Sequence, residues 1–265
     1  METSTQAQSA IVQKFLMQLF AKLPVNFTLA DLLRLTEKFQ EDFPELNLQH
    51  VVKHKPAIKL AYDYYVGDTR TAALKIPYLW HPYGAFLTAL DAGLPDYLAV
   101  AALLKPIAHQ RKSLVSSMNS ESLEVYLQLT NYQPLTDVMK ELSSISNETL
   151  GVGKSAAENK KTWPFRMKEK FKYLRSLSVD ALTVEFLSKL ENSHFDIEDL
   201  LAAKSDHWKL FNGKPGNEIA YLRECLHIFW PKIDGTFPSA QDLLTQLRTN
   251  INQLEELQNK NAEEM

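Results

Sequence analysis

The sequence predicts an all-α protein, and three observations lead to that prediction. Apolar residues recur every three or four positions along much of the 265-residue chain, as they do on the buried face of a helix. No stretch alternates apolar and polar residues for long enough to indicate a strand. At the centre, residues 76–111 have the pattern of two apolar helices joined by a short turn.

The ends of the central pair are marked by particular residues. Pro82 opens the first helix, because the first helical turn leaves the missing N–H of a proline without a partner anyway. Gly93 closes that helix, since the residue after a helix often needs a positive φ. The second helix is nearly all apolar from Leu98 to Leu104, which predicts burial on most of its sides.

Helices are also expected before this pair. Residues 11–23 have the apolar spacing of a helix, and Thr28 with Asp31 resembles a capping box at the start of another. A further helix is expected over 56–66. We therefore interpret residues 1–50 as an N-terminal helical extension that packs on the core or binds a partner.

The second half of the chain is expected to continue as helices. Residues 144–162 interrupt them as a long loop, because they are rich in Ser, Asn and Gly and show little periodicity. Ser239 and Asp242 are expected to cap the final helix, which follows a linker over 231–238. The expected helices before it are 120–130, 135–143, 165–177, 179–200 and 219–230.

This pattern predicts one main helical domain with additions at both ends. The boundaries are an extension over 1–50, a domain over 51–232, and a C-terminal helix and tail over 233–265 packed on the same unit. Leucine and isoleucine repeat in that tail for fewer than two heptads, so docking on the domain is expected rather than a coiled coil.

Composition narrows the classes of partner and compartment. The net charge of −3 gives no signal for nucleic acid or for a membrane surface. Cys225 is the single cysteine, which excludes an internal disulfide and a cysteine metal cluster, and its apolar surroundings predict a buried structural thiol. With neither an apolar run of transmembrane length nor a signal-peptide pattern, we expect a cytoplasmic protein, although non-classical secretion would leave the same pattern.

The central stretch PYLWHPYGAFLTALDAGLPDYLAVAALLKP is similar to the core of the HD-domain phosphohydrolases. The family members it resembles are the RelA/SpoT-type (p)ppGpp hydrolases, including the small metazoan-type homologues, whose pattern is PYI-x-HP, an apolar helix, Gly-Leu and AALLHD. Their His-x-Gly-Gln-x-Arg pattern matches residues 65–70, and their L-V-K-L-A-D-K/R-L-x-N signature matches residues 183–192. The resemblance spans roughly 56–229 and implies an HD-domain-like helical bundle.

The resemblance also implies a metal site that this chain has lost. The family holds a divalent ion, often manganese, which lowers the pKa of a bound water. The matching positions here are occupied by Tyr65, His81, Lys105, Pro106 and Ser188. Only His81 is a competent ligand, and the charge of Lys105 would repel a cation. We therefore expect no metal, no cofactor and no catalytic residue at these positions.

A second catalytic feature of the family is also missing. Its Glu-Asp pair, which serves the water and the phosphate, matches His109 and Gln110 here. Neither side chain is a carboxylate. The sequence therefore favours a catalytically inactive HD-domain pseudoenzyme that binds a partner protein.

Two other functions stay open. One is a metal-independent sensor of a guanine nucleotide or another phosphate ligand, and the other is a phosphohydrolase with a site rebuilt around His81 and His109, helped by Glu191 or His194. For the sensor, the resemblance implies that Arg70 and Asn192 lie near the nucleotide, and a lysine can neutralise a phosphate. The candidate ligand-binding residues are Arg70, His81, Lys105, Lys189 and Asn192.

Structural roles compete with each of these assignments. We expect His81 to be a buried, hydrogen-bonded histidine, with His109 and His194 at the surface or rim. An anion, Asp68 or Glu185, is expected beside Lys105, because burying an unpaired lysine is costly. The basic run in 165–177 is expected to be a solvated helix face, although it also suits phosphates or an acidic partner.

Overall fold

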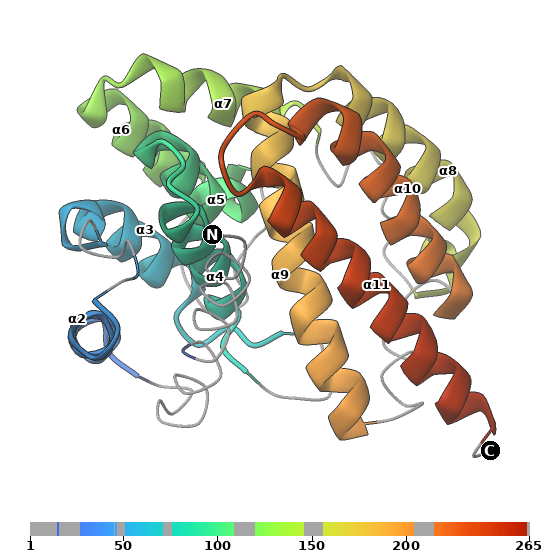
Figure 1. The fold of residues 1–265 in the computed structure, drawn as a ribbon. Coiled ribbons are helices and arrows are strands. Elements are labelled where there is room, and N and C mark those ends of the chain that lie inside the picture. Colours follow the sequence, from blue (N-terminus) through green and yellow to red (C-terminus); the bar gives the residue numbers. More distant parts are fainter. Residues whose placement is uncertain are drawn as a thin grey trace.

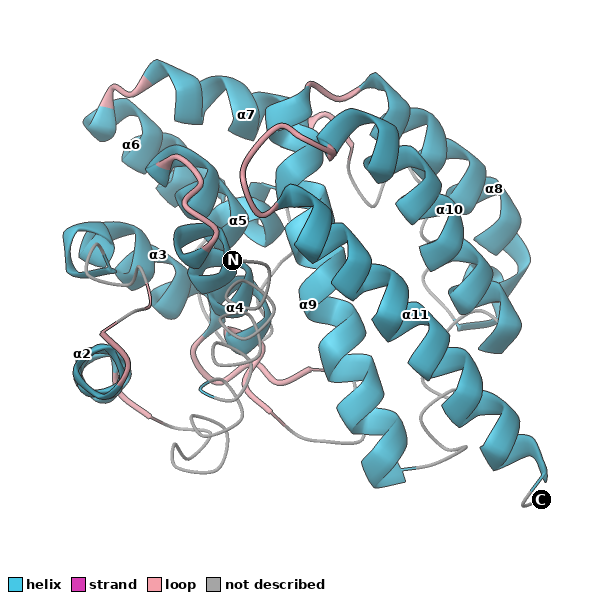
Figure 2. Cartoon of the chain, viewed as in Figure 1, coloured by secondary structure: helices cyan, strands magenta, loops and turns pink. Residues whose placement is uncertain are grey.

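The computed structural model describes residues 15, 27–44, 46, 51–70, 76–108, 120–145, 156–203 and 215–263. Within these ranges the chain is all-α, with ten α-helices, one 3-10 helix and an isolated bridge between Thr69 and Pro77 (Figures 1 and 2). The predicted fold class is confirmed.

The helices follow one another in this order: α2 (Leu29–Asp42), the 3-10 helix η1 (Val51–His54), α3 (Lys55–Tyr65), α4 (Trp80–Asp91), α5 (Asp96–Ala108), α6 (Ser120–Thr130), α7 (Gln133–Ser143), α8 (Ala156–Ser176), α9 (Val179–Ala203), α10 (Pro215–Ile233) and α11 (Ala240–Glu263).

The start of α2 carries the predicted capping box. The backbone N–H of Asp31 donates to the Thr28 hydroxyl over 3.2 Å, and the backbone N–H of Thr28 donates to the Asp31 carboxylate over 3.1 Å. Further along α2, the Thr36 hydroxyl lies 2.7 Å from the Tyr83 hydroxyl of α4, and both side chains are buried. The helix expected over 11–23 lies outside the described residues, apart from one buried phenylalanine.

The central pair forms as its end signals predict. Gly93 follows α4 with a φ of +69°, and its N–H donates to the carbonyl of Leu90 over 3.0 Å. Every side chain of α5 from Leu98 to Ala108 is buried. This follows from its position, since α3, α4, α6, α7 and α9 all pack against α5.

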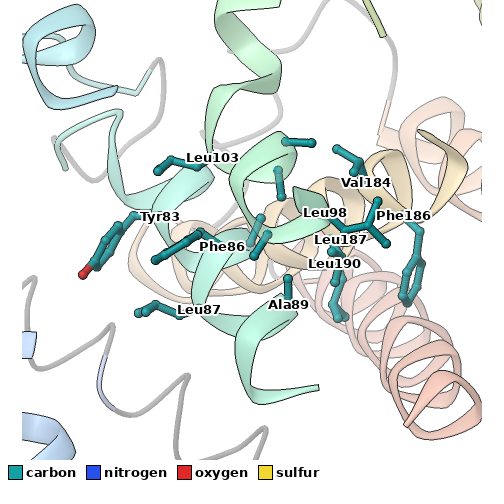
Figure 3. Packing of buried hydrophobic residues seen from close by; sticks show 14 of the residues in the cluster. Tyr83, Phe86, Leu87, Ala89, Leu98, Leu103, Val184, Phe186, Leu187 and Leu190 are labelled. Atoms are coloured by element: carbon teal, nitrogen blue, oxygen red, sulfur yellow. The ribbon is translucent and has the colours of Figure 1, made fainter. Parts of the chain in front are cut away.

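The middle of the core is shared by three helices. Figure 3 shows aromatic and aliphatic side chains of α4 meeting those of α5 and α9. On the other side of α9, α10 and α11 pack along it, and α8 packs on α10 (Figure 1). The labelled members of this cluster are Tyr83, Phe86, Leu87, Ala89, Leu98, Leu103, Val184, Phe186, Leu187 and Leu190.

Two predicted breaks in the helices are wrong. The loop expected over 144–162 ends early, because α8 already begins at Ala156. Its first turns contain Ala, Glu and Lys, which favour helix without any apolar period. The linker expected over 231–238 also starts too early, since Pro231 lies inside α10. A proline so close to the end of a helix removes only one hydrogen bond from the last turns.

The expected cap of the final helix is also different. Ser239 precedes α11, but its hydroxyl donates to the backbone carbonyl of Ala92 over 3.3 Å. The side chain therefore ties the start of α11 to the end of α4. Cys225 is fully buried on α10, and burial raises the pKa of its thiol to about 11, which confirms a structural thiol.

No helix in the described ranges is long and apolar enough to cross a bilayer.

Candidate functional site

Three of the residues at which the sequence predicts lost metal ligands, Tyr65, His81 and Ser188, lie near the middle of α9 or are connected to it. Ser188 of α9 faces the first turn of α4, where Nε2 of His81 lies 3.2 Å from its hydroxyl oxygen. The Tyr78 ring connects this pair to α3, with its centroid 6.2 Å from that of His81 and 4.9 Å from that of Tyr65. The exposed fractions are 1% for Tyr65, 5% for His81 and 4% for Ser188. The expected role of His81, buried and hydrogen-bonded, is confirmed.

Lys105 reaches the same region from α5 and meets a carboxylate. Its Nζ lies 3.1 Å from Oε2 of Glu185, one turn before Ser188 on α9. Nζ of Lys170 on α8 lies 3.0 Å from the other oxygen, Oε1. Glu185 has no exposed surface, and both lysines are buried. The expected anion beside Lys105 is therefore present, and it is Glu185 rather than Asp68.

Two positive charges share one carboxylate in this cluster. The pKa of Lys105 is lowered to about 8, mainly by burial. The attraction of Glu185 opposes this shift, and the charges of Lys170 and Lys189 add to it. Burial also lowers the pKa of Lys170. The Tyr173 hydroxyl lies 3.4 Å from Oε1 of Glu185 and 3.3 Å from the Leu142 carbonyl, so these two acceptors share its one hydrogen. The carboxylate is thus contacted by two ammonium groups and one hydroxyl, from α5 and α8.

These side chains do not suit a divalent cation. A metal of this class is bound by imidazole and carboxylate groups that converge on one point. At the matched positions, Lys105 brings a positive charge and Pro106 brings no donor atom. Within the described residues, no group of three His, Cys, Asp or Glu side chains is arranged to hold a metal ion.

Arg70 contacts a different part of α9. Its guanidinium lies 3.3 Å from Oδ1 of Asp196 and 4.5 Å from the centre of the Phe195 ring. Burial raises the pKa of Asp196 to about 6, although the charge of Arg70 opposes this shift. The ion pair between Arg70 and Asp196 connects the end of the α3 region to α9. The backbone N–H of Arg70 also donates to the carbonyl of Ile76 over 2.9 Å.

The other candidate cation has its own contact. Nζ of Lys189 lies 5.1 Å from the centre of the Tyr221 ring on α10. Asn192, one turn further along α9, is partly buried. The three cations proposed for one phosphate pocket therefore contact three different groups: Glu185, Asp196 and an aromatic ring.

Among the residues considered for a rebuilt hydrolase site, the described ones contact different groups. Oε1 of Glu191 accepts a 2.8 Å hydrogen bond from the buried Thr88 hydroxyl. His194 lies between α9 and α11, where its Nε2 is 3.0 Å from Nε2 of Gln246. The side chain is partly exposed, which fits a place at the rim, and burial of its other atoms lowers the pKa of His194 to about 4. His109 lies outside the described residues.

The basic run of α8 is only in part a solvated face. Lys168 and Lys172 are exposed as expected, and Arg175 forms an exposed ion pair with Glu224 of α10. Lys170 is the exception, because it is buried against Glu185. Sequence reasoning missed this contact, since a charge run gives no sign of which lysine faces inward.

One sequence signal could have pointed to the polar side of α9. Polar residues recur at helical spacing at 185, 188, 189, 192 and 196, which places them along one side of α9. Apolar spacing identified only the apolar side of this helix. The polar row is the one that meets Lys105, His81 and Arg70.

Comparison of this sequence with protein-family models and with curated proteins finds no match. The resemblance to the HD-domain phosphohydrolases therefore rests on the motifs of the chain itself.

Proposed function

We propose that this protein is a catalytically inactive HD-domain-like pseudoenzyme of the RelA/SpoT-hydrolase type, which acts by binding a partner protein. The supporting observation is the ion pair between Lys105 and Glu185, reinforced by Lys170. At the position matched to the family's His-Asp pair, a buried ammonium group is held where a cation would have to bind. A reducing, cytoplasmic setting is part of the proposal, since the single cysteine is a buried free thiol.

The chemistry of the neighbouring donors supports the same proposal. His81 is one imidazole, and its partner is the neutral hydroxyl of Ser188. One imidazole and one hydroxyl do not form a divalent-metal site, which needs several anionic or imidazole donors. Without the ion, no group at these positions lowers the pKa of a water molecule toward neutrality.

The test is a pair of measurements on purified protein. We expect substoichiometric manganese and zinc by mass spectrometry of metals, and no manganese-dependent release of pyrophosphate from guanosine tetraphosphate. A rebuilt variant, Tyr65→His with Lys105→His, Pro106→Asp and Ser188→Asp, should gain stoichiometric manganese. Metal-supported hydrolysis by the natural chain would contradict the proposal of inactivity, and a well-folded rebuilt variant without metal affinity would contradict the HD-like assignment.

A phosphate sensor is the second candidate, because positive charge exceeds negative charge around Glu185. Three ammonium groups, those of Lys105, Lys170 and Lys189, act on one another electrostatically around this carboxylate. A bound anion would reduce the electrostatic repulsion among these three ammonium groups. The test is thermal unfolding with guanine nucleotides and with inorganic pyrophosphate, where a hundredfold excess over the dissociation constant adds about 2.7 kcal/mol. An unchanged melting temperature with both ligand classes would remove this candidate.

A further inference from the structure

A cavity opens between α6 and α7 that the ion-pair cluster does not use. Its volume is about 420 Å³. Both helices pack on α5, and the space between them is floored by the end of α5. Figure 2 shows the two helices joined by a short turn at the edge of the molecule. The apolar floor consists of Ile107, Ala108, Leu123, Leu127 and Met139.

The rim of this cavity is polar and exposed. Glu124 and Gln128 line it from α6, and Thr136, Lys140 and Ser143 line it from α7. The α6 pair is spaced by four residues, and the α7 residues are spaced by four and three, so each wall is one face of its helix. An acid therefore lies on one wall and a base lies on the other. Glu124 and Lys140 do not form an ion pair with each other, so each charged side chain can contact an occupant of the groove.

α6 also exposes apolar side chains on the side that faces away from the cavity. The described residues expose six large hydrophobic side chains, and three of them lie on α6 or in the turn that follows it. Val125 is 52% exposed, Leu129 is 81% exposed and Tyr132 is 48% exposed. Successive helical residues are rotated by about 100°, so Val125 and Leu129 point away from the cavity that Glu124 and Gln128 line.

We propose that the α6–α7 groove binds an amphipathic helix of a partner protein. The apolar stripe of that helix fills the cavity, a basic residue on one edge meets Glu124, and an acidic residue on the other edge meets Lys140. Helices bind such grooves through apolar residues at positions i, i+3 or i+4, and i+7. This inference rests on the proposed function, since it names the surface through which a non-catalytic domain would bind its partner.

The occupant is a helix rather than a small molecule because of how the polar groups are arranged. The charges lie on opposite walls, at the exposed rim, and the apolar residues lie between them. Each wall runs along one helix, over residues 124–128 of α6 and residues 136–143 of α7. A helix that lies along the groove places its apolar stripe on the floor and one charged edge against each wall.

The experiment uses three synthetic helical peptides with the same number of leucines. The peptides differ in the order of these leucines or in the charged residues on the two sides of the leucine stripe. The mixed-edge peptide has lysines on one edge of the leucine stripe and glutamates on the other. The two-lysine-edge peptide has lysines on both edges, and a scrambled version of the mixed-edge peptide lacks the stripe. Binding to the full chain is measured by fluorescence anisotropy. Because an amphipathic helix can reverse its direction in the groove, the comparison does not depend on which edge faces α6.

The natural chain should bind the mixed-edge peptide about fivefold more tightly than the two-lysine-edge peptide, as one exposed attractive pair becomes repulsive. Lys140→Glu makes both walls acidic and should reverse this order. Lys168→Glu, an exposed change of the same charge on α8, should leave it unchanged. Equal binding of the scrambled peptide, or an order that Lys140→Glu does not change, would overturn the proposal.

A second pair of variants tests the cavity itself. Thr136→Phe fills the space from the α7 wall and should abolish binding of the mixed-edge peptide. Thr130→Phe, at an exposed position of α6 outside the lining, should preserve it. Circular dichroism confirms that each variant folds. Enhanced fluorescence of anilinonaphthalene sulfonate that Thr136→Phe removes, without binding of any peptide, would identify a small-molecule pocket and overturn the helix as occupant. If no peptide binds, the helix-binding groove is overturned. That result does not affect the metal and hydrolysis measurements, which test the proposed function separately.

Discussion

Nζ of Lys105 lies 3.1 Å from Oε2 of Glu185. Both side chains are buried, and Glu185 has no exposed surface. Lys170 holds the other oxygen of the same carboxylate. The cluster thus has one more positive charge than its ion pairs require. Since charges are costly to bury unless they are paired, this excess determines how the protein should respond to substitution and to pH.

Removing Lys105 should cost little stability, and removing Glu185 should cost much. In Lys105→Met, Glu185 keeps Lys170 as a partner, and a buried ion pair of one acid and one base remains. In Glu185→Gln, two buried ammonium groups lose their anion. We expect a change within about 1 kcal/mol for the first and a loss of about 3–5 kcal/mol for the second. Urea unfolding measures both, and equal losses would contradict the excess of positive charge.

Stability should rise with pH in the alkaline range because of Lys105. Its pKa falls from 10.5 to about 8 on folding, so between these values the unfolded chain binds more protons. The contribution of this group to the free energy of unfolding is fully present above pH 10.5 and is lost as pH falls to about 8. Unfolding of the natural chain and of Lys105→Met, compared at pH 7.5 and 9.5, isolates this contribution. A difference between the two proteins that stays constant with pH would contradict it.

His194 should make the protein sensitive to acid. Burial lowers its pKa from 6.5 to about 4, so its contribution is present above pH 6.5 and is lost as pH falls to about 4. We expect the natural chain to lose about 2 kcal/mol from this group between pH 7 and pH 5. His194→Gln should remove that part of the loss, and His227→Gln, at an exposed position, should not. Urea unfolding at the two pH values provides the comparison.

The Thr88 hydroxyl should stabilise the contact between α4 and α9. It donates to the buried Glu191 carboxylate over 2.8 Å, and Thr88→Val removes that donor while keeping the shape of the side chain. The expected loss is about 1–3 kcal/mol, the usual cost of removing a hydrogen-bond donor from a buried acceptor. Thr249→Val, an exposed site on α11, should change stability by less than about 0.5 kcal/mol. Thermal unfolding of both variants decides, and equal midpoints would show that the bond contributes nothing.

The ends and burial of the helices were predictable where their causes are local. The capping box of Thr28 and Asp31 and the positive φ of Gly93 depend on residues within one turn, and both formed as expected. The start of α8 was not predictable from the same rules. Its first turns are polar, and a polar helix start has no apolar period to mark it.

The candidate site was predictable only as a set of positions. The motifs placed Tyr65, His81, Lys105 and Ser188 in one region, and the contacts among α3, α4, α5 and α9 connect them. The motifs did not predict Lys170 or Asp196, because both lie outside the matched patterns or were treated as surface charge. A side chain on an amphipathic helix has an inward or outward direction that its own sequence leaves open when both faces carry charge.

By itself, the sequence determined that this chain is helical and that α5, the helix that carries Lys105, is buried at its centre. Those properties follow from backbone preferences and from the apolar content of short windows. Only the tertiary structure decided that Glu185 and Lys170 meet Lys105, that Asp196 meets Arg70 and that α6 and α7 leave a groove. Such contacts join residues far apart in the chain, and they depend on how whole helices pack against one another.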